Sequence, residues 1–297
     1  MLYTKKTKGT QTEKELAGEF SKFVSINDVE VHYEFAKGKS KTLVVLLHGF
    51  GASTYSYRHL LKQFSKFGDV IAYDRPCFGL TVRPKTWTGD NPYTFPAQVK
   101  LLDGIVEHFG QGKQIILVGH SAGAGIAAEW ALTNQDRVAA LILEEPAILA
   151  RPPAPKLLGS LLKSRAFDRL GPRLVAGFQK TGLGILYKSW FDKSGITEEV
   201  LENYQLPLKI KGWEAAFWEF SRNGVDSIIQ DHLAELKIPT MVFAADNDEI
   251  ILPKYSIAVA ELIPNAHLVK LTDCGHIPHE EKPKEFMQAV TDLINQR

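Results

Sequence analysis

The stretch QIILVGHSAG, residues 114–123, places the pattern Gly-x-Ser-x-Gly directly after an apolar run. A run such as 115–118 is typical of a strand that is buried on both faces of a sheet. The small residues after Ser121 predict a helix, so this serine lies on a sharp turn from strand to helix. The flanking glycines leave room for the turn, and the helix N-terminus supplies free backbone N–H groups. We therefore predict that Ser121 is a nucleophile; the alternative is a serine in an ordinary glycine-rich turn.

Outward from this turn, apolar runs typical of strands alternate with amphipathic or small-residue segments typical of helices. The predicted strands cover residues 42–47, 70–73, 114–119, 138–143, 239–245 and 267–271. The predicted helices cover residues 54–66, 94–109, 122–133, 254–262 and 283–295, and a hairpin at 22–35 precedes them all. This alternation predicts an α/β fold with a mostly parallel central sheet and helices on both faces.

The alternation stops between residues 146 and 236, after a proline-rich opening at 151–155 that works as a linker. The segment lacks a convincing strand pattern and is rich in aromatic residues, which predicts a helical lid inserted into the sheet. The expected organisation is a polar N-terminal arm at 1–21, the first part of the core at 22–145, the lid at 146–236 and the second part of the core at 237–297. Three lid residues are candidates for binding substrate, with packing onto the core as the alternative for each: Trp190, Trp213 and Trp218.

The run HGFG, residues 48–51, follows the predicted strand at 42–47. A backbone N–H at the end of a strand is rigidly held, and neighbouring glycines let the backbone come close to a substrate. We expect the N–H of Phe50 to form one half of an oxyanion hole. The N–H of Ala122, directly after the candidate nucleophile, would form the other half. The alternative is that His48 and the glycines only shape a loop.

His276 is the predicted general base among the nine histidines of the sequence. It follows the predicted strand at 267–271, and open α/β sheets place their ligands at the carboxyl ends of strands. The adjacent Gly275 gives the loop room to turn the imidazole toward Ser121. A serine hydroxyl needs such a base nearby in order to react near neutral pH.

The acid that orients this histidine is predicted in the loop 246–249, after the strand at 239–245. A carboxylate here gives the chain order serine, acid, histidine. We favour Asp248 because it lies deeper in the loop than Asp246, which stays open as the acid or as a loop cap. Glu144 or Glu145, after an earlier strand, is a more remote third option.

The composition argues against partners that bind through bulk charge. Charged residues make up 23% of the 297 residues and the formal net charge is +1, so nothing indicates nucleic acid or an anionic membrane. No apolar run approaches the roughly 18 residues of a spanning helix, and the N-terminus lacks the pattern of a secretory signal, which predicts a cytoplasmic protein. The two cysteines, Cys77 and Cys274, are expected to be free thiols.

No metal or organic cofactor is predicted. Residues 246–248 resemble the start of a calcium loop, but Ile251 occupies the position that requires glycine. The glycines around Ser121 do not fit the spacing of a dinucleotide fingerprint. The reaction is therefore expected to depend on side chains and backbone N–H groups alone.

Taken together, these motifs resemble the α/β-hydrolase superfamily, in the lid-bearing branch of serine hydrolases that includes esterases, carbon–carbon hydrolases and haloperoxidases without a cofactor. The resemblance runs from about residue 23 to the C-terminus. It is carried by HGFG at 48–51, YDRP at 73–76 with Gly79, GHSAG at 119–123, Asp248 and Gly275-His276. It implies the α/β-hydrolase fold, an acid at Asp248, and structural roles for Asp74 and Arg75. Epoxide hydrolases and haloalkane dehalogenases of this fold carry Asp where this chain has Ser121, which argues against both activities.

The predicted reaction is acyl transfer from a carboxylic ester to water, as in carboxylesterases. The aromatic residues of the predicted lid suggest a small substrate that is apolar or aromatic. One alternative is hydrolysis of a carbon–carbon bond by the same triad, which would need a basic group such as Arg83 or Arg151 for the substrate carboxylate. Another alternative is a lid-gated ligand receptor with slow turnover. The rate of ester turnover distinguishes the two, because an enzyme should turn over an ester many times and a receptor should not.

Overall fold

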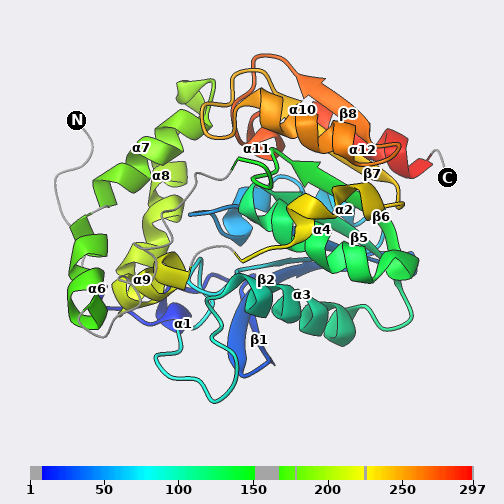
Figure 1. The fold of residues 1–297 in the computed structure, drawn as a ribbon. Coiled ribbons are helices and arrows are strands. Elements are labelled where there is room, and N and C mark those ends of the chain that lie inside the picture. Colours follow the sequence, from blue (N-terminus) through cyan, green and yellow to red (C-terminus); the bar gives the residue numbers. More distant parts are fainter. Residues whose placement is uncertain (1–8, 151–166, 178, 224–225, 296–297) are drawn as a thin grey trace.

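The computed structural model describes residues 9–150, 167–177, 179–223 and 226–295, which are built around one eight-stranded sheet (Figure 1). The strand order is β1-β2-β4-β3-β5-β6-β7-β8. The strands are β1 (Lys22–Ile26), β2 (Val29–Ala36), β3 (Thr42–Leu47), β4 (Asp69–Tyr73), β5 (Gln114–His120), β6 (Val138–Glu144), β7 (Thr240–Ala245) and β8 (His267–Leu271). The strand β2 pairs antiparallel with β1 and β4, and every other pairing is parallel. The predicted α/β fold with a mostly parallel sheet is confirmed.

The hairpin of β1 and β2 turns at Asn27 and Asp28, which both have positive φ angles of 50° and 62°. Two consecutive residues of this kind match the twist of a two-residue hairpin, and Asn and Asp tolerate the conformation better than most residues. The predicted hairpin therefore forms at the predicted place.

The side chains of β3 explain why the central strands are apolar at every position. Leu43, Val45 and Leu47 contact one helical layer, whereas Val44 and Leu46 contact the other. The first layer contains α3 (Phe95–Phe109), α4 (Ala122–Thr133) and α10 (Pro253–Leu262), and the second contains α2 (Leu61–Phe64) and α12 (Pro283–Asn295). Because both faces of the sheet are covered, every side chain of such a strand is removed from water. Each Å² of apolar surface buried in this way stabilises the fold by roughly 25 cal/mol.

The single helix predicted over 54–66 is wrong. The chain forms η1 (Thr54–Tyr57) and then the separate short helix α2. Ser53 caps η1, and the buried Tyr57 hydroxyl donates to the carbonyl of Leu47 at the end of β3. This tertiary hydrogen bond fixes the first turn to the sheet, which a helical periodicity in the sequence does not reveal.

The strands β6 and β7 are separated in sequence by a helical segment, which we call the insertion. Its described helices are α6 (Phe167–Gly177), α7 (Gln179–Ser189), α8 (Glu198–Gln205) and α9 (Trp213–Asn223), and they gather on one side of the molecule, at the left of Figure 1. The predicted linker at 151–155 lies outside the described residues. That the insertion acts as a lid, and the domain division built on it, stay predictions.

The described part of the N-terminal arm lies against the insertion. The helix α1 (Glu13–Leu16) begins with a capping box between Thr12 and Glu15. Just before it, Gln11 forms a parallel bridge with Ile210, and its carbonyl accepts from the N–H of Lys211. Backbone hydrogen bonds therefore connect the arm to the chain between α8 and α9.

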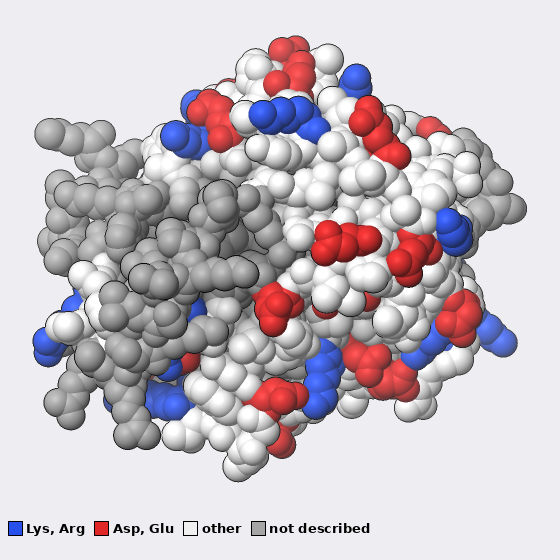
Figure 2. Space-filling model, viewed as in Figure 1, with Lys and Arg blue, Asp and Glu red and all other residues white. Residues whose placement is uncertain are grey.

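The remaining short helices complete the described chain. They are η2 (Gln135–Arg137), η3 (Lys193–Gly195), η4 (Leu206–Lys209), η5 (Ile229–Asp231), η6 (Leu233–Glu235) and α11 (Pro278–Glu281). None of the helices in the described ranges combines the length and the apolar character that crossing a bilayer requires. Figure 2 shows acidic and basic side chains interspersed over the described part of one face, in keeping with the net charge of +1.

Replacing Phe286 with alanine is expected to lower the free energy of unfolding by about 3–5 kcal/mol. Its fully buried ring stacks on that of Phe243, with ring centroids 4.5 Å apart, and so packs α12 against the sheet. Urea unfolding measures the loss. Leu262→Ala is the control, because Leu262 is 46% exposed in α10 and should change stability by no more than about 0.5 kcal/mol. Equal losses in the two variants would contradict this packing.

Candidate active site

Ser121 lies at the junction of β5 and α4, in a backbone conformation that is rare for a residue with a side chain. Its φ and ψ angles are 51° and −113°. Its N–H donates to the carbonyl of Glu144 (2.8 Å), and its own carbonyl accepts from the N–H groups of Ala124 and Ala147 (3.1 and 3.2 Å). Strain of this kind persists only where the surrounding structure holds it, and it is concentrated at functional sites.

Two glycines allow neighbouring segments to pass close to this turn. A Cβ atom on Gly123 would lie 2.3 Å from the carbonyl oxygen of Leu47, so α4 could not start so close to the end of β3. A Cβ atom on Gly49 would lie 2.6 Å from the Nδ1 of His120 and 3.1 Å from the Cβ of Ser121. The HGFG run is therefore in contact with the turn that carries the serine.

The two candidate oxyanion donors belong to segments that adjoin Ser121. Ala122 is the first residue of α4, and the first N–H groups of a helix have no partner within it. Phe50 follows Gly49, and its half-exposed ring lies 5.6 Å from that of Phe78 and 5.5 Å from that of Phe217 on α9, between centroids. That the two N–H groups hold an oxyanion stays a prediction.

His276 and Asp248 are hydrogen-bonded in the interior, with 2.7 Å between Nδ1 of the ring and Oδ2 of the carboxylate. The other oxygen of Asp248 accepts from the N–H groups of Ile250 and Ile251 at 2.7 and 2.9 Å. Both side chains are buried, whereas Asp246 is exposed to solvent. Of the two aspartates considered from the sequence, the one in contact with the histidine is Asp248.

His120, directly before the serine, joins the two loops. Its Nε2 lies 2.7 Å from the carbonyl oxygen of His276, and the centroids of the two rings are 4.7 Å apart. Among the described residues, Ser121 Oγ has no hydrogen bond to the His276 ring. The serine and histidine loops are thus in contact through His120. The sequence analysis missed this link, and its only signal was the presence of a histidine within the Gly-x-Ser-x-Gly motif.

The C-terminal end of α7 also contacts the loop that carries His276. The N–H of His276 donates to the carbonyl of Ser189 (2.7 Å). One carboxylate oxygen of Glu281 accepts from the N–H of Gly275, and the other accepts from the N–H groups of Phe191 and Asp192. The insertion and the loop of His276 are therefore fastened together.

The sequence model for the alpha/beta hydrolase fold matches residues 42–283. The chain belongs to this family of hydrolases. It is 25% identical over 284 residues to the uncharacterized hydrolase YugF of Bacillus subtilis, which covers 91% of this chain and 96% of YugF.

Solved structures of other α/β hydrolases superpose on most of this chain. A thermophilic esterase from Thermogutta terrifontis does so with a TM-score of 0.69 and 23% identity, over 93% of this chain and 98% of the esterase. A meta-cleavage product hydrolase from Pseudomonas fluorescens IP01 gives a TM-score of 0.69 and 21% identity, over 94% of this chain and 98% of that hydrolase. At these identities the likeness shows the fold and leaves the reaction open.

The two glutamates considered as remote acids have other partners. Glu144 is paired with His279, with 2.6 Å between Oε2 and Nδ1, and both side chains are fully buried. The carboxylate of Glu145 accepts from the N–H of Ala245 (2.8 Å) and the hydroxyl of Ser256 (3.2 Å). Burial raises the pKa of Glu145 well above its ordinary value, and the nearby charge of Asp248 adds to the rise. Neither glutamate is bonded to His276.

The three candidate tryptophans are all buried within the insertion or against it. Trp190 packs against Leu201 of α8 and against Ile277, the residue after His276. Trp213 and Trp218 belong to a second cluster, where Trp218 stacks on Phe167 of α6 at 6.3 Å between centroids. Only Trp190 adjoins the histidine loop, and substrate binding by any of the three stays a prediction.

Arg83, the basic group suggested for a substrate carboxylate, is engaged elsewhere. Its guanidinium donates to the carbonyls of Thr81, Cys77 and Gly79 at 3.1, 3.3 and 2.9 Å. It also lies 3.6 Å from the carboxylate of Glu13. Arg151, the other suggestion, lies outside the described residues. In the described ranges, no group of three or more His, Cys, Asp or Glu side chains could hold a metal ion.

The Glu144–His279 pair predicts a pH dependence of stability. Burial lowers the pKa of His279, but the charge of Glu144 and its hydrogen bond outweigh burial, so the pKa lies above its ordinary value. The folded state therefore binds this proton more tightly than the unfolded state, and the contribution is lost as the pH rises above about 6.5. Urea unfolding over a pH series should show a fall in stability that is smaller in His279→Gln. Identical slopes in the two proteins would contradict the assignment.

Proposed function

We propose that this α/β hydrolase cleaves the carboxylic ester of a small apolar or aromatic molecule through Ser121, His276 and Asp248. The observation that supports this most directly is the buried hydrogen bond of 2.7 Å between His276 Nδ1 and Asp248 Oδ2. An ionised carboxylate only accepts hydrogen bonds, so it keeps the proton of the neutral ring on Nδ1 and leaves Nε2 as a base. A serine on a strained turn in the adjoining loop is the group that such a base would activate.

In the proposed reaction, Ser121 Oγ attacks the ester carbonyl while His276 Nε2 takes its proton, and Asp248 stabilises the imidazolium. The N–H groups of Phe50 and Ala122 bind the developing oxyanion. Loss of either donor would raise the activation free energy by about 3–4 kcal/mol. His276 then returns the proton to the leaving alcohol, and water releases the acid. The bond from Ser121 to the ring would form when substrate binds, because such hydrogen bonds are often long or absent without substrate.

The preference for an apolar ester rests on the rings beside the proposed oxyanion donor. Phe50 is surrounded by Phe78, Phe217 and Phe220, with centroid separations of 5.6, 5.5 and 6.0 Å. Aromatic side chains of this kind favour apolar groups through buried area. Ester cleavage is preferred over carbon–carbon hydrolysis because Arg83, the one of the two suggested carboxylate-binding groups that lies within the described residues, already binds three carbonyls of its own loop.

Turnover of p-nitrophenyl esters of increasing chain length tests the proposed activity. Many turnovers per protein, with a preference for one range of chain lengths, are expected of an esterase. A single release of p-nitrophenolate followed by a stall would favour a ligand receptor instead. No ester turnover, with turnover of a diketone-like acid, would favour carbon–carbon hydrolysis.

Ser121→Ala should reduce ester hydrolysis by at least about a thousandfold, because it removes the proposed nucleophile. Labelling by a fluorophosphonate at position 121 should disappear in the same variant. Ser65→Ala, at the end of α2 and away from the proposed triad, is the matched control and should keep its activity. Full activity in Ser121→Ala would end the proposal.

Asp248→Asn should lower kcat by a factor of about 10⁴, since an amide at this position favours the wrong tautomer of His276. Asp246→Asn should have little effect, because the Asp246 side chain is exposed and its N–H bonds to the carbonyl of Leu271. Steady-state kinetics of the two variants, which differ by two positions in one loop, give the comparison. Small and equal losses would reject Asp248 as the acid.

A further inference from the structure

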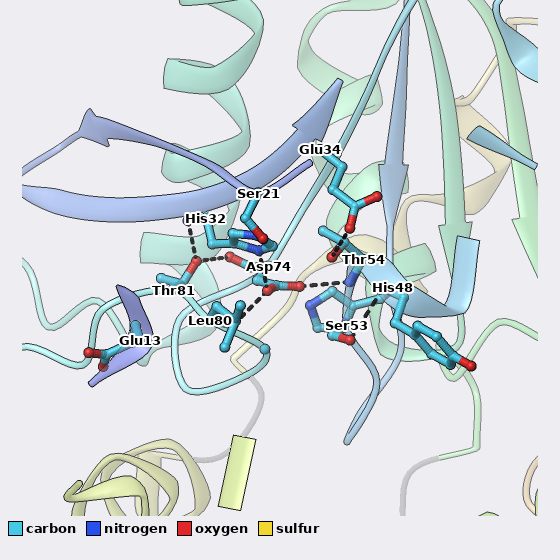
Figure 3. Close-up of polar contacts among 12 residues, drawn as sticks. Glu13, Ser21, His32, Glu34, His48, Ser53, Thr54, Asp74, Leu80 and Thr81 are labelled. Carbon is cyan, nitrogen blue, oxygen red and sulfur yellow. Dashed lines mark hydrogen bonds and ion pairs between the residues drawn. The ribbon is translucent and has the colours of Figure 1, made fainter. Parts of the chain in front are cut away.

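A second line of serine, histidine and aspartate lies outside the proposed site. His32 on β2 has its Nε2 2.8 Å from Ser21 Oγ and its Nδ1 2.7 Å from Asp74 Oδ2 (Figure 3). In the sheet, β2 is separated from the serine strand β5 by β4 and β3. In this arrangement the carboxylate orients the imidazole, and the imidazole can activate the hydroxyl.

The carboxylate of Asp74 is held ionised and aimed at His32. It is fully buried, and its two oxygens also accept from the N–H groups of Thr54 (2.7 Å) and Leu80 (2.6 Å). Burial raises the pKa of Asp74, but the charge and hydrogen bond of His32, the charge of His48 and the hydrogen bond from Leu80 outweigh burial, so the pKa lies below its ordinary value. An ionised carboxylate only accepts, so in the neutral ring Nδ1 carries the proton and Nε2 accepts from the hydroxyl of Ser21.

Ser21 is within reach of small molecules. It is half-buried and follows a tight turn, in which its N–H donates to the carbonyl of Gly18 (3.1 Å) and its Oγ accepts from the N–H of Gly18 (3.2 Å). A cavity of about 210 Å³ opens beside it, with lining residues that include Leu16, Ser21, His32, Glu34, Tyr55 and Leu206. A volume of this size suits a small acyl group.

The charges around the cavity limit what enters it. Glu34 lies beside Thr54, with 3.5 Å between Oε1 and the hydroxyl, and Asp74 lines the same cavity. Burial raises the pKa of Glu34, the charge of His32 opposes that rise, and the charge of Asp74 adds to it. With Glu19, three acidic residues line the cavity and disfavour an anionic ligand, so an uncharged one is expected.

We propose that Ser21 is a second nucleophilic hydroxyl, which takes a small uncharged acyl group from an activated ester in this cavity. Ser21 Oγ forms a bond to the carbonyl carbon, and its proton passes to His32 Nε2. The bond from that carbon to the leaving oxygen breaks, and the leaving group departs as a phenolate or takes the proton from His32. The products are an acyl ester on Ser21 and a free phenol or alcohol.

The acyl group should accumulate rather than turn over. Ser21 lies between Phe20 and Lys22 before β1, not at a turn from a strand into a helix. It therefore lacks N–H groups of a helix start, such as those beside Ser121, that could stabilise an oxyanion, so only an activated ester with a good leaving group is expected to acylate it. The ester then formed on Ser21 has an alkoxide as its leaving group, so its hydrolysis is much slower. One acylation event per protein is expected.

The test uses Ser121→Ala protein incubated with p-nitrophenyl acetate. The expected result is one acetyl group at Ser21, found by peptide mapping, with release of about one equivalent of p-nitrophenolate and no turnover. Adding His32→Gln should slow this acetylation by about a hundredfold, the contribution of a general base. Because mapping locates the group in the Ser121→Ala protein itself, the answer does not depend on how the His32 variant folds.

Ser53→Ala, also in the Ser121→Ala background, is the matched control. Ser53 lines the same cavity, but its Oγ accepts from the N–H of Tyr55 and has no histidine partner. Acetylation of Ser21 should continue in this variant. No acetyl at Ser21, or acetylation that is equally fast without His32, would overturn the proposal and would leave Ser21 as a fastening of the arm to the sheet.

Discussion

The close approach of three backbone segments at the carboxyl end of β5 is the constraint on which the rest of the site depends. Ser121 keeps its positive φ because its N–H and carbonyl are bonded to the end of β6 and the residues after it. Gly123 lets α4 start against the end of β3, and Gly49 lets the next loop reach the serine. A Cβ atom at either glycine would separate elements that the proposed reaction needs together, so the strain at the serine persists because neighbouring segments hold it.

A row of histidines extends this constraint into the core. The ring of His120 lies between those of His276 and His279, at centroid distances of 4.7 and 4.9 Å. His279 is in turn paired with Glu144 and stacked on Tyr57, whose hydroxyl binds the end of β3. The loop of the histidine in the proposed triad is thus linked by buried contacts to β5, β6 and β3. In the part of the chain that the structure describes, His120 Nδ1, Glu144 Oε1 and His279 Nε2 have no hydrogen-bond partner, so the network is only partly satisfied.

Much of the fold could be predicted from the sequence because burial on both faces produces continuous apolar runs. The strands and the helices α3, α4, α10 and α12 lie close to where these patterns predicted them. The helix over 54–66 was predicted wrongly, since the break after η1 depends on a hydrogen bond from Tyr57 to another strand. Local periodicity carries no information about a contact of that kind.

The site was predictable only where a motif or a loop position marks it. The motif around Ser121 and the loops of His276 and Asp248 could be read directly, and the structure brings the last two into contact. The pairs Glu144–His279 and His32–Asp74 could not be predicted, because each joins residues far apart in sequence. Asp74 lies in the YDRP motif, but nothing around His32 marks it as the partner. No motif or spacing in the sequence connects Ser21, in a polar arm, with a buried histidine on β2.

The bridge between Gln11 and Ile210 has a consequence for how the insertion can move. The insertion is joined to the core through β6 and β7 in the chain, and the bridge attaches it to the N-terminal arm near the start of α9. The end of α7 is also held, because the carbonyl of Ser189 accepts from His276 and the N–H of Phe191 donates to Glu281. Residues 11 and 210 lie far apart in the sequence but are backbone-bonded, so the described part of the arm and the insertion are expected to shift as one unit.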